Sequence, residues 1–341
     1  MNIAFFRLEQ WEKEYIEKHD DFKKLNAGAV FFDEKLDKDH LPNDTSAEVI
    51  SIFIDSKIDK EVLAAFPNLK CIVTRSTGFD HIDMQACAER NIVVSNVPSY
   101  GEDTVAEYTF GLILALTRKI YQGFDQIRET GSFSLEGLRG IDLRGKTLGV
   151  IGTGKIGRNV VRIARGFEMN VIACDTDPDE AFAKEMQMTY CEPFKALQEG
   201  DIVTLHIPYS KETHHLINKG NISMMKKGAY LINTSRGGVV ETEALVGALK
   251  SGHLGGAALD VLEEEGVIQD ELEFFMEGRV EEHNLKTVLA NHILFDMPNV
   301  IITPHNAFNT WEALRRILDT TLGNIKAFAD GNPANLVGVK Q

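Results

Sequence analysis

Three apolar segments in the second half of the sequence each lead into a residue that could bind an anion or move a proton. Residues 231–233 lead to Arg236, residues 257–261 lead to a run of glutamates, and residues 300–303 lead to His305. An arginine can pair with a carboxylate through its planar fork and polarise a neighbouring carbonyl. A histidine can exchange a proton near neutral pH. These residue types together suit hydride transfer between a nicotinamide cofactor and a 2-hydroxy or 2-keto acid.

An acidic partner would complete this set, because a carboxylate beside an imidazole orients the ring and favours its charged form. Glu263, Glu264 and Glu265 are three candidates in one run. Taken singly, an arginine after a strand is usually in a surface ion pair, and most histidines are structural or solvated. The interpretation therefore depends on a cofactor motif elsewhere in the chain.

Such a motif is present as Gly152, Gly154 and Gly157, which have the spacing G-x-G-x-x-G. An apolar run over residues 147–151 precedes it, and a helical pattern over residues 155–167 follows it. The first glycine permits a tight turn, the second lets the backbone approach a pyrophosphate, and the third lets helix and strand pack closely. The helix N-terminus then faces the anion. The sequence predicts a dinucleotide-binding loop here.

The acidic residue that this motif requires is Asp175, which ends the next apolar run. A carboxylate at this point can accept hydrogen bonds from both ribose hydroxyls of adenosine. It would repel a 2′-phosphate, and the following Thr176 and Asp177 provide no arginine to accept one. NAD is therefore favoured over NADP. Lys155 could neutralise charge on the pyrophosphate or be solvated.

Short β-rich runs alternate with helical patterns along almost the whole chain, which predicts parallel sheets covered by helices on both faces. We expect a long helix from residue 103 or 104 to about 121 and a loop over residues 131–145. The sequence thus indicates an α/β protein with two doubly wound parallel-sheet units, although composition does not show the boundary between them. The expected strands cover residues 3–6, 49–53, 71–74, 92–95, 146–151, 171–174, 202–207, 230–233, 257–261 and 300–302.

Composition excludes several classes of protein. A length of 341 residues suggests about two domains. The net charge of -15 disfavours binding to nucleic acid or to an anionic membrane. No apolar run is long enough to span a bilayer, and the first residues lack the pattern of a signal peptide. The 4 cysteines form no Cys-x-x-Cys pair, so we expect reduced thiols and a cytoplasmic protein.

No metal site is expected from the sequence. The chain has no H-E-x-x-H motif. His214 and His215 are adjacent, so on a regular element their side chains should point in different directions.

The sequence resembles the D-isomer-specific 2-hydroxyacid dehydrogenase family, most closely its D-lactate dehydrogenase-like branch, over nearly the whole chain. The segments that carry the resemblance are residues 74–83, 95–101, 105–107, 148–157, 205–208, 233–238, 259–265 and 303–305. The family fold implies a Rossmann NAD-binding domain, residues 101–304, inserted into a flavodoxin-like substrate domain, residues 1–100 and 305–341. It also implies a homodimer in which the long helix from residue 103 helps to form the contact.

The resemblance assigns roles residue by residue. Arg236 matches the arginine that binds the substrate carboxylate, His305 the acid/base, and Glu265 its partner, because the family's acid lies five residues after the aspartate that here is Asp260. Asp260 matches a residue near the nicotinamide carboxamide. The cofactor-lining positions are Gly152, Gly154, Lys155, Ile156, Gly157, Asp175, Ile207, Pro208, Thr213, Thr234, Ser235 and Asp260. The substrate-facing positions are Phe53, Thr77, Gly78, Tyr100 and Phe308.

The preferred substrate is less sharply defined. Phe53 and Phe308 would narrow a pocket toward a short side chain such as methyl, or they could be core residues. Asn306 and Asn309 depart from the pattern of the D-lactate branch, which usually has Ile-Ala and two aromatic residues after the histidine. We expect reduction of pyruvate to D-lactate first. Alternatives are a branched 2-keto acid, glyoxylate, hydroxypyruvate or 3-phosphoglycerate, or an NADH-responsive corepressor-like binding module.

Overall fold

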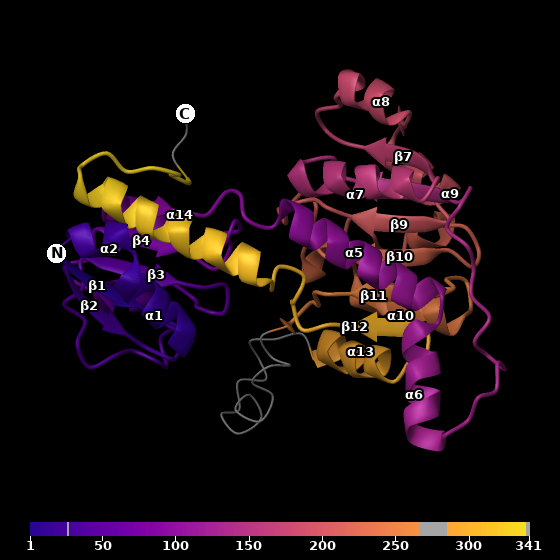
Figure 1. Cartoon of the computed structure of the whole chain (residues 1–341), viewed down its shortest axis with the longest axis horizontal. Coiled ribbons are helices and arrows are strands. Elements are labelled where there is room, and N and C mark those ends of the chain that lie inside the picture. The colour runs from indigo at the N-terminus through magenta and orange to yellow at the C-terminus, as the bar shows by residue number, and fades with distance from the viewer. Residues whose placement is uncertain (26, 266–284, 339–341) are drawn as a thin grey trace. The chain divides into compact units, whose positions relative to one another are not determined.

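The structure is a computed structural model that describes residues 1–25, 27–265 and 285–338. The chain divides into two compact units (Figure 1). The first consists of Met1–Tyr100 and Thr310–Gln341, and the second of Gly101–Asn309. The division therefore falls after residue 309 rather than after residue 304, and His305 belongs to the second unit.

The first unit contains a five-stranded sheet in which every strand pair is parallel. The strand order β2-β1-β3-β4-β5 is the doubly wound order of flavodoxin-like folds, as expected. The strands are β1 (Asn2–Phe5), β2 (Gly28–Phe31), β3 (Val49–Ile52), β4 (Cys71–Thr74) and β5 (Val93–Ser95).

Two layers of helices cover this sheet because successive strand side chains point to opposite faces. Ile3 and Phe5 pack with residues of α1 (Gln10–Lys18) and α14 (Trp311–Ala329). Ala4 on the opposite face packs with residues of α3 (Lys60–Ala65) and α4 (Met84–Glu89). A further helix, α2 (Asp20–Leu25), has no buried residue.

The second unit contains a seven-stranded sheet, also with parallel pairs throughout. The strand order is β12-β11-β10-β9-β6-β7-β8. Strands β6 to β8 extend the sheet toward one edge and strands β9 to β12 extend it toward the other, as in a Rossmann fold. The strands are β6 (Thr147–Ile151), β7 (Asn170–Cys174), β8 (Thr189–Tyr190), β9 (Ile202–Leu205), β10 (Tyr230–Asn233), β11 (Gly256–Leu259) and β12 (Val300–Ile302).

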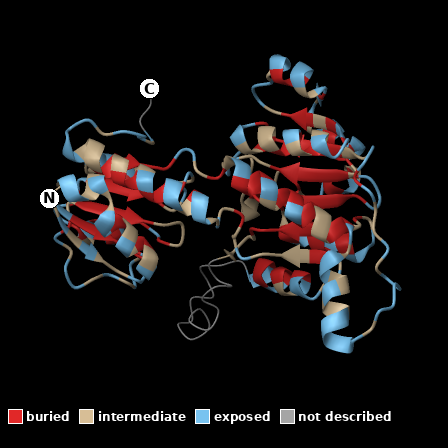
Figure 2. Cartoon of the chain, in the orientation of Figure 1, coloured by how far each residue is buried: buried red, intermediate tan, exposed pale blue. Residues whose placement is uncertain are grey.

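Helices again cover both faces, and the strands of both sheets are largely buried (Figure 2). Residues of α5 (Glu102–Thr117) and α7 (Lys155–Gly166) pack on one face. Residues of α9 (Pro193–Glu199), α10 (Thr242–Lys250) and α13 (Leu285–Phe295) pack on the other. The remaining helices of this unit are α6 (Ile120–Thr130), α8 (Glu180–Met186) and the 3-10 turns η1 (Ile222–Met224) and η2 (Gly237–Val239).

One expected helix is divided in the structure. The helix that should run to about residue 121 ends at Thr117, and α6 begins at Ile120. Lys119 between them has a left-handed φ of 56°, which a continuous α-helix does not accommodate. Cys71, Cys87, Cys174 and Cys191 are all free thiols, as expected.

Candidate active site

The glycine motif forms the turn between β6 and α7, and two of its glycines are required by close packing. Gly152 has a φ of +93°, and a Cβ there would lie 2.5 Å from the carbonyl oxygen of His206. A Cβ on Gly157 would lie 2.0 Å from the carbonyl oxygen of Gly152. At Gly154, the N-cap of α7, nothing lies within 4 Å of that position. The loop is therefore tight inside and open at its second glycine, where a pyrophosphate needs to approach.

Asp175 follows β7, the strand beside β6, and is half-buried. Its Oδ2 atom accepts hydrogen bonds from the backbone N and the Oγ1 of Thr153, at 2.6 and 2.9 Å. Its Oδ1 atom accepts one from the backbone N of Asp177 at 3.0 Å. Burial alone would raise the pKa of this carboxyl, but these hydrogen bonds lower it below its ordinary value. An ionised acceptor thus stands beside the glycine loop, which fits the ribose of NAD.

Arg236, Glu265 and His305 follow three neighbouring strands. They lie after β10, β11 and β12, and β11 pairs with both of the others. The Nδ1 atom of His305 lies 3.0 Å from Oε1 of Glu265. Parallel strands end at one edge of a sheet, which is where ligands bind in doubly wound folds. The structure therefore brings together the histidine and the glutamate that the sequence analysis paired.

Asp260 fixes the turn that carries His305. Its buried carboxylate accepts hydrogen bonds from Thr303 Oγ1 at 2.5 Å, Asn306 N at 2.9 Å and Ala307 N at 2.9 Å. Its backbone carbonyl accepts from His305 N at 2.8 Å. Burial raises the pKa of Asp260, and the three hydrogen bonds oppose that rise. The φ of 51° at His305 shows how sharply this turn is bent.

A second polar residue, which sequence reasoning missed, shapes the loop of Arg236. Asn233, the last residue of β10, donates from Nδ2 to the carbonyl oxygen of Arg236 at 2.9 Å. Its Oδ1 atom accepts from Ser235 N at 3.0 Å and Ser235 Oγ at 2.8 Å. The hydroxyls of Thr234 and Thr109 lie 3.0 Å apart. A polar residue that ends an apolar strand was the available signal.

The other expected cofactor-lining residues lie on the same unit. Thr213 closes a compact turn by donating to the carbonyl oxygen of Pro208 at 2.8 Å and accepting from Ser210 N at 2.7 Å. Ile207 and Pro208 lie in the loop after β9, which ends at Leu205. Lys155 and Ile156 open α7, where Lys155 Nζ lies 3.3 Å from Glu102 Oε1.

The expected substrate-facing residues divide between the units. Phe53, Thr77, Gly78 and Tyr100 belong to the first unit and Phe308 to the second. Thr77 Oγ1 donates to the carbonyl oxygen of Val97 at 2.8 Å, and Ser76 Oγ donates to that of Gly78 at 2.7 Å. The backbone carbonyl oxygen of Tyr100 accepts a hydrogen bond from Arg316 Nε at 2.8 Å.

Phe53 and Phe308, which are both expected to face the substrate, each lie beside a nitrogen-containing side chain. The guanidinium of the buried Arg75 lies 5.8 Å from the ring centre of Phe53. The Phe308 ring meets the His305 ring edge-on, with centres 6.4 Å apart. Asn309 Nδ2 donates to Asn306 Oδ1 at 2.9 Å, so these two amides bind one another.

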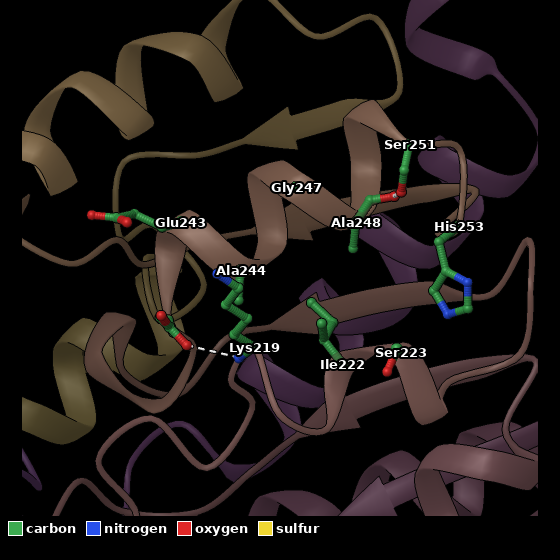
Figure 3. Close-up of a pocket in the computed structure, with 10 residues that line it drawn as sticks. Lys219, Ile222, Ser223, Glu243, Ala244, Gly247, Ala248, Ser251 and His253 are labelled. Carbon is green, nitrogen blue, oxygen red and sulfur yellow. Dashed lines mark hydrogen bonds between the residues drawn. The ribbon is translucent and has the colours of Figure 1, made fainter.

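A hollow of about 410 Å³ lies elsewhere on the second unit, along α10 and η1 (Figure 3). Lys219, Glu241, Glu243 and His253 contribute to its wall, and none of the expected substrate or cofactor residues does. The backbone N of Lys219 donates to Glu241 Oε2 at 2.7 Å. Within residues 1–25, 27–265 and 285–338, no group of three His, Cys, Asp or Glu side chains could hold a metal ion. No described helix combines the length and apolar character needed to cross a bilayer.

These features define a dinucleotide-dependent oxidoreductase with an Arg, a Glu and a His at one sheet edge. Residues 110–307 match the family model of the D-isomer specific 2-hydroxyacid dehydrogenase, NAD binding domain. The chain belongs to the D-isomer specific 2-hydroxyacid dehydrogenase family. It is an NAD-dependent D-2-hydroxyacid dehydrogenase.

Individual relatives cover most of the chain. A 2-hydroxyacid dehydrogenase homolog of Zymomonas mobilis is 38% identical over 95% of this chain and 96% of its own length. A glyoxylate reductase of Thermofilum pendens is 39% identical over 85% of this chain and 81% of its own length. The structure of D-lactate dehydrogenase from Aquifex aeolicus, complexed with NAD and lactic acid, has a TM-score of 0.86 and 36% identity, and covers 100% of both chains.

Proposed function

We propose that this dehydrogenase uses NADH to reduce a small 2-keto acid, with pyruvate and D-lactate as its preferred pair. The observation that carries the proposal is the placement of Arg236, Glu265 and His305 after three adjacent strands, with the imidazole and the carboxylate in contact. An enzyme of this kind needs a cation for the substrate carboxylate and a proton donor for the carbonyl oxygen.

Each of the three residues has one task in the proposed reaction. When bound, NADH supplies the hydride that reduces the carbonyl carbon. Arg236 pairs with the substrate carboxylate and orients the neighbouring carbonyl. His305 gives a proton from Nε2 to the carbonyl oxygen, because its Nδ1 faces Glu265. Glu265 orients the ring and stabilises the imidazolium that must form before each proton transfer. In the reverse direction His305 accepts the proton of the hydroxyl group.

The remaining assignments complete this proposal. The second unit binds NAD through the glycine loop, Asp175 and the lining residues of the β9 and β10 loops. The proposed substrate contacts are the backbone N–H groups of Thr77 and Gly78 and the side chains of Phe53, Tyr100 and Phe308. The Phe308 ring is in edge contact with that of His305. The rings of Phe53 and Phe308 favour a substrate with a short side chain.

The choice of pyruvate is supported by the similarity to the Aquifex enzyme and by these two phenylalanines. Glyoxylate is the second candidate, and the Thermofilum relative favours it. Branched 2-keto acids, hydroxypyruvate and 3-phosphoglycerate use the same chemistry. A corepressor-like binding module would bind NADH tightly without turnover.

The test is the rate of NADH oxidation across these 2-keto acids, with NADPH run in parallel. We expect the highest kcat/KM with pyruvate and NADH. A higher kcat/KM with glyoxylate than with pyruvate would make glyoxylate the preferred substrate of the same reaction. Tight NADH binding with no turnover on any 2-keto acid would contradict the proposal.

We also propose that the protein is a cytoplasmic homodimer. Helix α6 has no buried residue, and Ile120, Phe124 and Ile127 on one of its faces are exposed. An apolar helical face of this kind is typical of a subunit contact. Phe124→Lys should shift the mass in sedimentation from two chains to one, whereas Phe194→Lys on α9 should not. A single-chain mass for the unmodified protein would contradict the dimer. The four free thiols support a reducing compartment.

A further inference from the structure

A second imidazole–carboxylate pair lies in the second unit, and the proposed reaction does not use it. His215 Nε2 lies 2.6 Å from Glu263 Oε1. The Glu263 side chain is 14% exposed and that of His215 33% exposed, so the pair is partly shielded from solvent. A contact this short between ionisable groups is a strong hydrogen bond.

Glu263 binds three separate segments of the unit at once. Its Oε2 atom accepts from Thr242 N at 2.8 Å and from Thr242 Oγ1 at 2.6 Å, at the start of α10. Its backbone carbonyl accepts from Asn291 Nδ2, on α13, at 2.7 Å. Its remaining carboxylate oxygen holds His215 in the loop after β9. Glu263 thus fixes the turn that contains Glu265, two residues further on.

His215 is held equally firmly on its own side. Its backbone has a left-handed φ of 50°, and its N donates to the carbonyl oxygen of Gly238 at 2.8 Å. Its ring stacks on that of His214 with centres 3.8 Å apart, and His214 Nδ1 lies 3.1 Å from Tyr209 Oη. The two adjacent rings can stack because they lie in a turn, whereas the expectation that they point apart applied to a regular element.

The loop of Arg236 is closely packed between the turn that contains Glu263 and the loop that contains His215. A Cβ on Gly237 would lie 2.0 Å from the carbonyl carbon of Leu262 and 2.4 Å from Glu263 N. A Cβ on Gly238 would lie 2.7 Å from Tyr209 Cε2. Close-packed backbone cannot absorb a shift locally, so a displacement of the 262–265 turn is passed to the loop of Arg236.

We propose that His215 and Glu263 are a positioning pair that holds Arg236 and Glu265 in the geometry the reaction requires. The inference rests on the proposed function of those two residues. Neither member of the pair needs to touch the substrate. A misplacement of about 1 Å at catalytic groups can cost roughly 100-fold in rate, so the pair should affect turnover more than NADH binding.

The experiment compares three variants with the unmodified protein as purified. They are Glu263→Ala, the shape-preserving Glu263→Gln and His215→Phe. Glu243→Gln is the matched control, because Glu243 is exposed on the same helix as Thr242. We expect kcat/KM for the best 2-keto acid to fall about 10- to 100-fold in Glu263→Ala and His215→Phe, and less in Glu263→Gln. The Kd of NADH should change less than about threefold, because the glycine loop and Asp175 follow β6 and β7, away from the Glu263 turn.

A double-mutant comparison separates positioning from general stability. If Glu263 acts by placing Glu265, then Glu263→Gln should cost much less in a Glu265→Gln background than in the unmodified chain. Multiplicative losses, or a folded Glu263 variant with the kcat/KM of the Glu243→Gln control, would overturn the inference. Failure of the proposed function is a different result, because His305→Ala and Arg236→Ala would then retain turnover.

Discussion

The Nδ1 atom of His305 lies 3.0 Å from Oε1 of Glu265, although the two residues are 40 positions apart in the chain. The contact forms because β11 and β12 are parallel neighbours whose following turns meet at one edge of the sheet. Asp260, the first residue after β11, then ties down the turn of His305 through three hydrogen bonds. The geometry of this His–Glu pair is therefore a property of the sheet and not of the local sequence.

Glu265→Gln tests the electrostatic part of this contact. An amide does not place a negative charge beside the imidazole and holds the ring less firmly, so kcat/KM for 2-keto acid reduction should fall about 10- to 100-fold. The measurement is the rate of NADH oxidation with the best 2-keto acid. Glu264→Gln serves as the comparison, and a loss of rate in that variant instead would move the role to Glu264.

Arg236→Ala should abolish productive binding of the 2-keto acid. Losing one partner of a shielded ion pair costs about 2–5 kcal/mol, which corresponds to a fall in kcat/KM of roughly 30-fold or more. The Kd of NADH should stay nearly constant. Arg144→Ala is the control, because that side chain is 77% exposed and pairs only with Glu168 among the ion pairs of the described residues. An equal loss of NADH affinity would contradict the assignment of Arg236 to the substrate.

Gly157→Ala should weaken NADH binding by at least about tenfold, as seen in a fluorescence titration. Its Cβ would lie 2.0 Å from the carbonyl oxygen of Gly152, so either α7 or the loop must shift. Gly166→Ala on the same helix has nothing within 4 Å of the new atom and should leave NADH affinity unchanged. It should also stabilise the helix slightly, because alanine has the higher helix propensity. Equal NADH affinity in both variants would contradict the packing argument.

His206 makes the folded protein sensitive to mild acid. Burial lowers the pKa of His206 to about 3, and its Nε2 lies 2.9 Å from Thr204 Oγ1. Below pH 6.5 the unfolded chain binds a proton at this residue that the folded chain does not bind, so stability falls as the pH falls toward 3. One such group contributes at most about 1.4 kcal/mol per pH unit.

His206→Gln should therefore lose less stability than the unmodified protein between pH 6.5 and pH 4.5, measured by urea unfolding. His292→Gln is the comparison for a histidine with a different environment. Parallel pH dependences for the unmodified protein and His206→Gln would show that this imidazole titrates normally in the folded state.

The sequence predicted the parts of this molecule that periodicity and strand ends encode. Strands such as Tyr230–Asn233 and Val300–Ile302 agree with expectation because they are short apolar runs between breaks. Strand β2 was missed, because its residues alternate between exposed and half-buried and include no buried one. The break between α5 and α6 depends on the φ of Lys119, for which residue type gives no signal.

The candidate site also has parts that the sequence predicted and parts that it did not. Arg236 and His305 could be found because each follows an apolar run, and the glycine motif has a fixed spacing. The hydrogen bond of Asn233 to Arg236 is local, whereas the supporting hydrogen bonds of Asp260 and Glu263 join segments that are distant in sequence. Such contacts follow from strand order, which a single sequence does not specify.

The most direct test of the central claim is the configuration of the product formed from pyruvate and NADH. The unmodified protein should produce D-lactate at a rate that His305→Ala and Arg236→Ala do not approach, while both variants still bind NADH. Production of L-lactate, or undiminished D-lactate formation by the His305→Ala variant, would contradict the account.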